Sequence, residues 1–423
     1  MNSHKLLKSN SGAGTLIFLC WLVYAMSYLG KVNYSANITQ IIEFYDITKA
    51  EAGMAPTFFF FSYGIGQVLN GILCKKYNIK WMVFSSLVMS GIINLVIAVS
   101  TEFTIIKWLW LLNGLVLSIL WPTLIRLLSE VLPQKDLGKS SIVMGTTVAT
   151  GTLIIYALSS IFVAFHRFKL AFFTAAFVGM FVAVIWLFMY DKATNLSKAK
   201  QLSEKKNSDI KLNIQEKPLQ NSFEKKIFYT SICVLCFCAI GVNLIKDGLT
   251  TWVPSILKDE YSITDSLSIL LTLCLPILAI FGNLFALNLN KKIPDYVTHC
   301  ATVFAVMLVL IGIIIGSLAI KQAAFMLIGL ILVNFSASSL NSLITSIFPI
   351  FMRGKVNSGL FAGILNGFCY LGSTISSYGL GSIADNFGWV SVFWTLAGFC
   401  VAVCIVWCVY ACLKHIWKGR AES

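Results

Sequence analysis

Charged residues are scarce in this chain. Asp, Glu, Lys and Arg make up 12% of the 423 residues, which is about half of the roughly 25% typical of soluble proteins. Apolar residues make up 57%, more than a soluble fold of this length can bury. The composition therefore excludes an ordinary soluble enzyme and indicates a chain that folds in a lipid bilayer.

Residues for catalysis, metal binding and disulfides are also few or badly placed. There are four His, and nearly all of the 12 Cys lie in apolar segments. Cys233 and Cys236 form a CxxC inside an apolar run, and one stripe repeats every four residues: Cys400, Cys404, Cys408 and Cys412. We interpret both sets as packing residues and expect no disulfide framework, metal or cofactor. No nucleophile–base pair or phosphate-binding glycine loop lies where water could reach it, so we expect no enzymatic activity.

Twelve apolar runs are long enough to cross a bilayer, which takes about 20 residues per helix. They cover residues 13–41, 52–73, 81–100, 104–128, 140–164, 169–190, 227–257, 266–289, 296–320, 323–348, 356–383 and 389–413. The sequence predicts an all-α membrane protein with two six-helix bundles, 1–190 and 227–423. The polar, lysine-rich segment 191–226 is expected to be a flexible cytoplasmic linker. The first run is too long for a signal peptide and lacks a clear cleavage site, so we expect it to be retained.

The net charge of +14 is unevenly distributed along the chain. Most Lys and Arg fall on the side of the two termini and the linker, whereas the opposite loops carry acids such as Glu43, Asp259 and Asp265. The loop with Arg167 and Lys169 is the local exception. By the positive-inside rule, both termini are cytoplasmic in a plasma (inner) membrane protein. The basic charge therefore orients the chain among lipids, and we expect no nucleic-acid partner.

The two halves of the chain repeat one another at an offset of about 216 residues. Matching features are Tyr45 and Tyr261 after the first and seventh runs, Gly66 and Gly282, Pro133 and Pro349, and Gly138-Lys139 and Gly354-Lys355. Duplicated halves are typical of transporters with a midplane substrate site between the repeats.

Two lysines lie inside predicted spans at equivalent repeat positions. Lys31 lies in the first run and Lys246 in the seventh, and each is followed by about ten residues before the outer surface. That distance, about 15 Å, is too long for a lysine stem to reach water. An ammonium at such depth costs about 2.5–3.5 kcal/mol, so we expect both lysines to face a water-filled cavity.

Polar residues accompany both lysines at helical spacing. One face of the first run carries Tyr24, Ser27, Tyr28, Lys31, Tyr34 and Ser35; the other stripes are Asn243, Lys246 and Thr250; Asn366, Tyr370, Ser373 and Ser377; and Tyr63 with Gln67. Any single stripe could equally join helices. Together they predict a site for an anion with hydrogen-bonding groups. Its predicted substrate-binding residues are Lys31, Lys246, Tyr24, Tyr28, Ser35, Tyr63, Gln67, Asn243, Asn366 and Tyr370.

Asp247 is the one acid well inside a predicted span, and the spans of the first half contain no Asp, Glu or His. Because it follows Lys246 directly, it points about 100° away on a helix and need not pair with that lysine. Three roles remain open: a proton carrier, a tether to another helix, or the outer lip of the cavity. The lack of acids in the first half favours exchange of anions over a proton relay.

Several motifs resemble the organophosphate:phosphate antiporter family, which includes glycerol-3-phosphate and hexose-phosphate transporters. They are Tyr28-Leu29-Gly30-Lys31-Val32-Asn33-Tyr34, Leu244-Ile245-Lys246-Asp247-Gly248, Trp252-Val253-Pro254, Trp121-Pro122, Gly71 with Asn78, Tyr370-Leu371-Gly372 and Phe387-Gly388-Trp389. The resemblance covers nearly the whole chain. It implies the major facilitator fold and an organic anion exchanged for inorganic phosphate, with Lys31 and Lys246 at the family's two phosphate-binding arginine positions. We also expect a monomer.

The sequence departs from that family pattern at the charged positions. Both arginines are replaced by lysine, which offers a point charge where arginine offers a bidentate fork. Val148 occupies a histidine position, Gln67 a second cation position and Lys75 an acidic position. A carboxylate such as a sugar acid therefore remains open as the substrate, with proton symport as the coupling. A membrane sensor of an organic phosphate is the alternative from another functional class.

Overall fold

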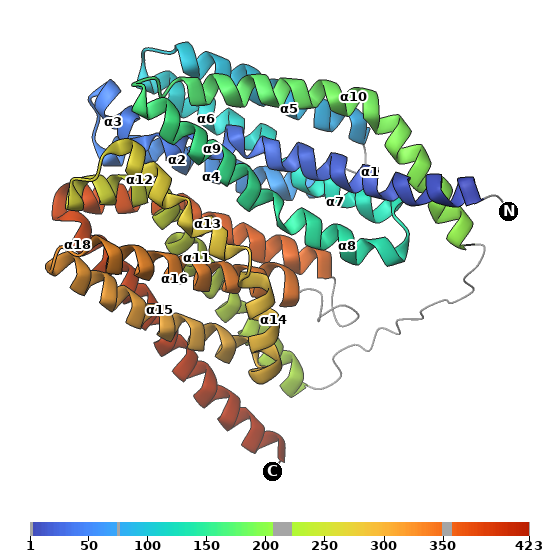
Figure 1. Ribbon diagram of the computed structural model, residues 1–423. Coiled ribbons are helices and arrows are strands. Elements are labelled where there is room, and N and C mark those ends of the chain that lie inside the picture. The colour runs from blue at the N-terminus through green and yellow to red at the C-terminus, as the bar shows by residue number, and fades with distance from the viewer. Residues whose placement is uncertain (1–2, 74–76, 206–221, 349–357, 423) are drawn as a thin grey trace. The chain divides into compact units, whose positions relative to one another are not determined.

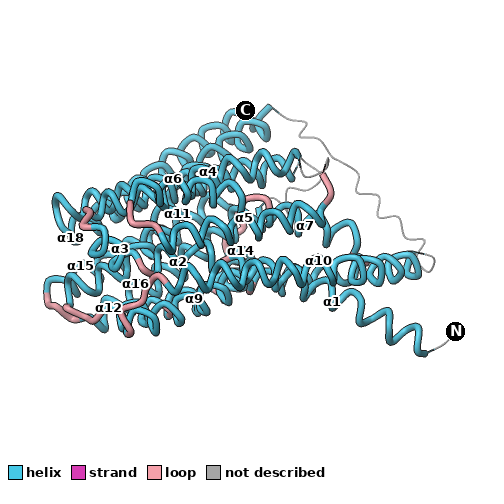
Figure 2. Tube along the Cα trace, turned by 90° about the horizontal axis from the view of Figure 1, so that it is seen from above, coloured by secondary structure: helices cyan, strands magenta, loops and turns pink. Residues whose placement is uncertain are grey.

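The structure is a computed structural model that describes residues 3–73, 77–205, 222–348 and 358–422. Its regular elements in these ranges are all helices (Figure 2), so the all-α prediction is confirmed. In the described ranges nine helices are long and apolar enough to cross a membrane, or ten with the bent pair Asp265–Ala279 and Leu284–Lys292. Helix α18 (Ser358–Glu422) includes the described part of the eleventh predicted span and all of the twelfth, and its backbone departs from helical geometry between them at Gly388, whose φ is +77°.

Packing divides the chain into two units. Unit 1 comprises Met1–Gln40 and Phe61–Asn213, and unit 2 comprises Ile41–Phe60 and Ile214–Ser423. The predicted bundles 1–190 and 227–423 follow the sequence repeat and not this packing, so their limits stay a prediction. The helix α4 (Lys49–Leu73) contributes its first half to unit 2 and its second half to unit 1.

Unit 1 is built from the helices of the first half. They are α1 (Ser3–Ser27), α2 (Leu29–Ala36), the start of α3 (Ile38–Tyr45), the end of α4, α5 (Ile79–Val99), α6 (Phe103–Leu117), α7 (Leu120–Val131), α8 (Gln134–Gly145), α9 (Thr147–Ala164) and α10 (Leu170–Lys205). α1 packs along α10 and α9, and α10 also packs on α5 (Figure 1). The first predicted span is thus three helices in a row, α1, α2 and α3, with breaks at Tyr28 and Asn37.

The segment 191–226, predicted to be a linker, begins and ends in helix. Helix α10 continues to Lys205, and α11 (Ser222–Tyr261) already begins at Ser222. Packing and one ion pair account for the extension of α10. Ala193 and Ser197 are buried, and Asp191 forms an ion pair of 2.6 Å with Lys80. Residues 206–221 lie outside the described residues.

Unit 2 contains the helices of the second half together with Ile41–Phe60. After α11 come α12 (Asp265–Thr272), α13 (Cys274–Ala279), α14 (Gly282–Lys292), α15 (Tyr296–Ala319), α16 (Ala323–Ser342), the π-helix η1 (Leu343–Ile347) and α18. α11 packs along α18, which also packs on α15. Asp385 of α18 accepts hydrogen bonds from the backbone N–H groups of Lys49 and Ala50, at 3.2 and 2.7 Å. The carboxylate therefore caps the first turn of α4, where orphan N–H groups favour negative charge.

The internal repeat extends to backbone conformation and packing. Asp46 and Ser262, which end the first helix of each half, both have positive φ, 49° and 54°; this is the left-handed conformation that terminates many helices. A Cβ on Gly66 would lie 2.2 Å from Ser118 Oγ, and one on Gly282 would lie 3.0 Å from the backbone N of Ser339. Both glycines thus allow the second helix of their half to approach the fourth. Pro349, Gly354 and Lys355 lie outside the described residues.

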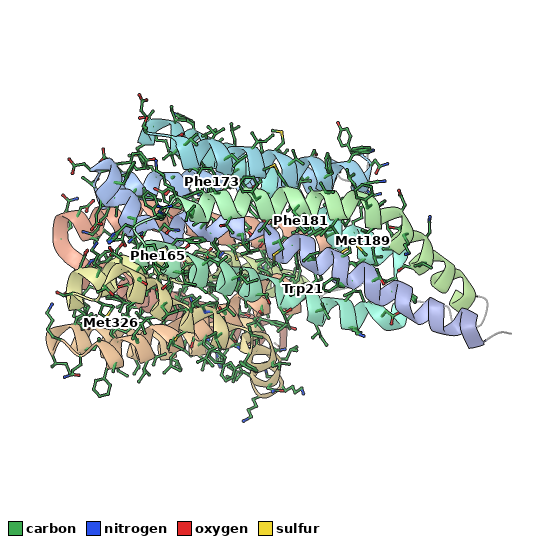
Figure 3. All side chains as sticks on the ribbon, turned by 45° about the horizontal axis from the view of Figure 1, so that its top comes forward. Trp21, Phe165, Phe173, Phe181, Met189 and Met326 are labelled. Carbon is green, nitrogen blue, oxygen red and sulfur yellow. The ribbon has the colours of Figure 1, made fainter. Side chains whose placement is uncertain are left out.

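Large apolar side chains cover much of the outside of both units. On α10, Phe177 and Phe181 are 62% and 65% exposed, and Phe165 at the end of α9 is 72% exposed; Figure 3 labels Phe165 and Phe181. Monomeric soluble proteins rarely expose apolar surface on this scale. Such side chains are suited to contact with lipid tails.

Candidate functional site

Each unit holds one cluster of polar and aromatic side chains around a lysine, and we call each cluster a half-site. The half-site of unit 1 is centred on Lys31, in the first turn of α2. The helix is interrupted just before it, because α1 ends at Ser27 and the backbone N–H of Lys31 bonds to the carbonyl of Tyr28, three residues back, at 3.1 Å. The Lys31 ammonium lies 4.0 Å from the ring centroid of Tyr63 and 4.9 Å from that of Tyr28. Both distances fit cation–π attraction. The lysine therefore points toward aromatic side chains of unit 1.

Other predicted residues join this cluster. The Tyr24 and Tyr63 hydroxyls are 3.4 Å apart, and Gln67 Nε2 donates to the Tyr63 hydroxyl at 3.2 Å. Trp121, which the predicted site omitted, packs on Tyr24 with ring centroids 4.7 Å apart. Ser35 is buried one turn beyond Lys31. Of the predicted unit 1 residues, the structure thus brings together Tyr24, Tyr28, Lys31, Tyr63 and Gln67.

A buried amide network stabilises the backbone that carries Lys31. Asn113 Nδ2 of α6 donates to the Gly30 carbonyl at 2.8 Å, and Asn33 Nδ2 donates to Asn94 Oδ1 of α5 at 2.8 Å. Ser90 connects the two by donating to Asn113 Oδ1 at 2.7 Å and accepting at its carbonyl from Asn94 Nδ2 at 2.9 Å. Sequence reasoning missed this network. Its signal was a set of lone polar residues in otherwise apolar spans.

The unit 2 half-site is centred on Lys246 in α11. Asp247 does contact its neighbour: Lys246 Nζ lies 3.3 Å from Asp247 Oδ1. The other carboxylate oxygen accepts from Ser373 Oγ of α18 at 2.5 Å and from Asn243 Nδ2 at 3.4 Å. The long lysine stem reaches around the helix surface, so the 100° between consecutive Cβ directions does not separate the charges. Asp247 also acts as a tether between α11 and α18.

Further polar groups surround the unit 2 lysine. Asn243 Nδ2 donates to Ser373 Oγ at 3.2 Å, and Thr250 Oγ1 donates to the Lys246 carbonyl at 2.8 Å. Asn334 of α16, which the sequence did not single out, donates to Thr250 Oγ1 at 3.4 Å. Asn366 and Tyr370 are part-buried on the Ser373 face of α18, and the Tyr370 ring stacks on Phe60 at 6.5 Å.

Each half-site therefore contains one lysine, and the side chains around the two lysines differ in kind. In unit 1 the Lys31 ammonium lies against tyrosine rings, and in unit 2 the Lys246 ammonium lies against a carboxylate. Both offer hydroxyl and amide groups that can donate or accept hydrogen bonds. No group of three or more His, Cys, Asp or Glu that could bind a metal occurs among the residues the structure describes.

Comparisons with known proteins show which proteins the chain is similar to. The membrane sensor protein UhpC of Salmonella typhimurium is 24% identical over 123 residues, 29% of this chain and 28% of the sensor, so the match spans less than a third of that protein. A Chlamydia muridarum protein named as a probable hexose phosphate transport protein is 20% identical over 400 residues, 88% of this chain and 84% of its own length.

Solved structures and a family model agree on the fold. The crystal structure of a D-xylose-proton symporter superposes with a TM-score of 0.72 at 11% identity, over 93% of this chain and 97% of the symporter. This confirms the predicted fold of two six-helix bundles. The family model for the Major Facilitator Superfamily matches residues 20–362. A match over so much of the sequence means that this multi-pass membrane chain belongs to the Major Facilitator Superfamily.

Proposed function

We propose that the chain carries a small organic anion across the plasma (inner) membrane, an organophosphate in exchange for inorganic phosphate. The observation that carries this proposal is the pair of lysines at equivalent repeat positions, Lys31 and Lys246, each inside a span and each among polar or aromatic side chains. A cation inside a span is costly and marks substrate or ion pathways. The name of the Chlamydia muridarum relative supports a hexose phosphate as the first substrate to test.

In this proposal both half-sites bind the same substrate, and the protein acts as a carrier and not as an enzyme. An anion that binds more tightly when both lysines reach it stabilises the closed intermediate by that difference in affinity. Loaded carriers then reorient faster than empty ones, which produces exchange. The charge distribution supports cytoplasmic termini, and we propose a monomer.

The Lys246–Asp247 pair supports a second candidate, proton-coupled symport of a carboxylate such as a sugar acid. At 3.3 Å, the Asp247 carboxylate compensates one lysine even without substrate, so the empty carrier needs no anion to neutralise Lys246. Binding a proton at Asp247 would release the ammonium for the substrate. This candidate differs from exchange in what drives uptake.

Uptake of labelled glucose 6-phosphate and of a labelled sugar acid, measured in parallel in proteoliposomes, separates the candidates. Exchange requires phosphate inside the vesicles and proceeds without a proton gradient, at the same pH on both sides. Uptake without internal anion that follows an inward proton gradient and disappears in Asp247→Asn would establish symport and refute exchange.

A membrane sensor is a third candidate, favoured by the partial match to UhpC. A sensor binds glucose 6-phosphate but does not move it. Saturable binding to the purified protein, with no uptake under either driving condition, would support the sensor and contradict both transport candidates.

A further inference from the structure

Asp247 occurs in only one of the two half-sites, so the repeated fold does not by itself require an acid beside the lysine. The repeat equivalent of Asp247 is Val32, and the predicted spans of the first half contain no Asp, Glu or His. Helix α2 therefore carries its lysine without an adjacent carboxylate in the sequence. The acid beside Lys246 needs a reason other than the architecture of the repeat.

The carboxylate is positioned to act on anything that binds Lys246. Its Oδ1 lies 3.3 Å from the ammonium, and its Oδ2 accepts from Ser373 Oγ at 2.5 Å. The hydrogen bond from Ser373 of α18 would keep the Asp247 carboxylate in place if Lys246 turned toward another anion. The side chains of Lys246 and Asp247 remain 25% and 17% exposed, so a ligand can reach the ammonium while the carboxylate stays beside it.

We infer that Asp247 is a specificity-determining residue that selects substrates by charge, favouring monoanions over dianions at Lys246. The inference rests on the proposed function, because it requires Lys246 to receive the anionic group of the substrate. A bound anion lies a few ångströms from the Asp247 carboxylate, and like charges repel in proportion to the product of their charges. A dianion therefore meets about twice the repulsion that a monoanion meets in the same position.

This proportionality predicts how Asp247→Asn changes binding. Asparagine keeps the shape and can still bond to Ser373, but it removes the negative charge. If the substitution tightens binding of a monoanion about threefold, it tightens binding of a dianion about tenfold, because doubling the repulsion squares the factor. A change that merely repacks the site would affect both ligands equally.

The experiment compares two ligands that share one sugar. Glucose 6-phosphate is a dianion at pH 8, since the second pKa of a phosphate monoester is about 6, whereas its methyl ester is a monoanion. Dissociation constants are measured for both ligands on the purified full chain, with wild type, Asp247→Asn, Lys246→Gln and Lys246→Gln/Asp247→Asn, and the gain in the double variant is taken relative to Lys246→Gln. Glu260→Gln, which removes a charge near the outer end of α11 where Glu260 pairs with Lys321, is the matched control.

The expected result is a larger gain for the dianion in Asp247→Asn, no such gain in the double variant, and none in Glu260→Gln. Equal gains for the two ligands, or weaker binding of the dianion, would overturn the inference and leave the proposed function standing. If wild type and Asp247→Asn bind neither ligand, the proposed function itself fails and the inference fails with it. A gain that persists in the double variant would place the effect away from Lys246 and also overturn the inference.

Discussion

Removing the ammonium of Lys246 is expected to destabilise the protein through the carboxylate left behind. Two unit charges 3.3 Å apart attract by about 5 kcal/mol at an effective dielectric constant of 20 and by about 1.3 kcal/mol in water. Because both side chains are part-buried, we expect a coupling energy of about 2–4 kcal/mol between them. Methionine is the substitution of choice, because it keeps the length of the stem without the charge.

The measurement is a double-mutant cycle in detergent micelles. Lys246→Met and Asp247→Asn should each lower the free energy of unfolding, and the double variant should recover most of the loss because neither charge is left alone. Transport should stay abolished in the double variant, since the substrate still lacks its cation. A coupling energy indistinguishable from zero, or normal uptake by the double variant, would refute the reasoning.

Three further outcomes follow from other contacts. Lys31→Met should abolish uptake, because the substrate loses one of its two cations; uptake at the wild-type rate would contradict this. Gly151→Val should destabilise by about 2 kcal/mol or more, since a Cβ there would lie 2.1 Å from the Ala25 carbonyl, whereas Gly145→Val, with nothing within 4 Å, should be tolerated in the same thermal melts. Burial alone would raise the pKa of Asp295, but hydrogen bonds from Thr298 and Lys414 lower it below its usual value. Asp295→Asn keeps the capping oxygen but removes the negative charge at the start of α15, so it should cost about 0.3–1 kcal/mol at neutral pH. That cost should vanish as the pH falls through the lowered pKa of wild type, and a cost independent of pH would exclude the ionised carboxylate as its source.

Helical periodicity was sufficient to predict how the residues of one span are arranged. Tyr24, Tyr28 and Lys31 lie at helical spacing on the first span, and the structure places them in one cluster with Tyr63. Their relation depends mainly on the 3.6-residue period, which survives the break at Tyr28. The twelve apolar runs could also be identified from the sequence, because the length of a span depends on the thickness of the bilayer.

Contacts between different helices could not be predicted in the same way. The bond from Asn113 to the Gly30 carbonyl and the contact of Asn334 with Thr250 depend on which helices pack together. The Lys246–Asp247 pair depends on side-chain rotation, which the direction of the Cα–Cβ bond does not determine. The continuation of α10 to Lys205 was not predicted from the sequence, because a lysine-rich segment is compatible both with an exposed linker and with a helix.

Because α4 is divided between the two units, the position of Tyr63, the aromatic partner of Lys31, depends on contacts in both units. Phe60 is the last residue of α4 that packs with unit 2, and Tyr63 follows three residues later in unit 1, about 4.5 Å along the helix axis. Pro56, in the unit 2 half of α4, removes a backbone hydrogen bond and eases bending there, but the helix between Phe60 and Tyr63 has no such interruption. Tyr63, whose ring faces the Lys31 ammonium, therefore continues the same helical backbone as Phe60. The position of the aromatic partner of Lys31 is thus set by a helix that belongs to both units, and not by the packing of unit 1 alone.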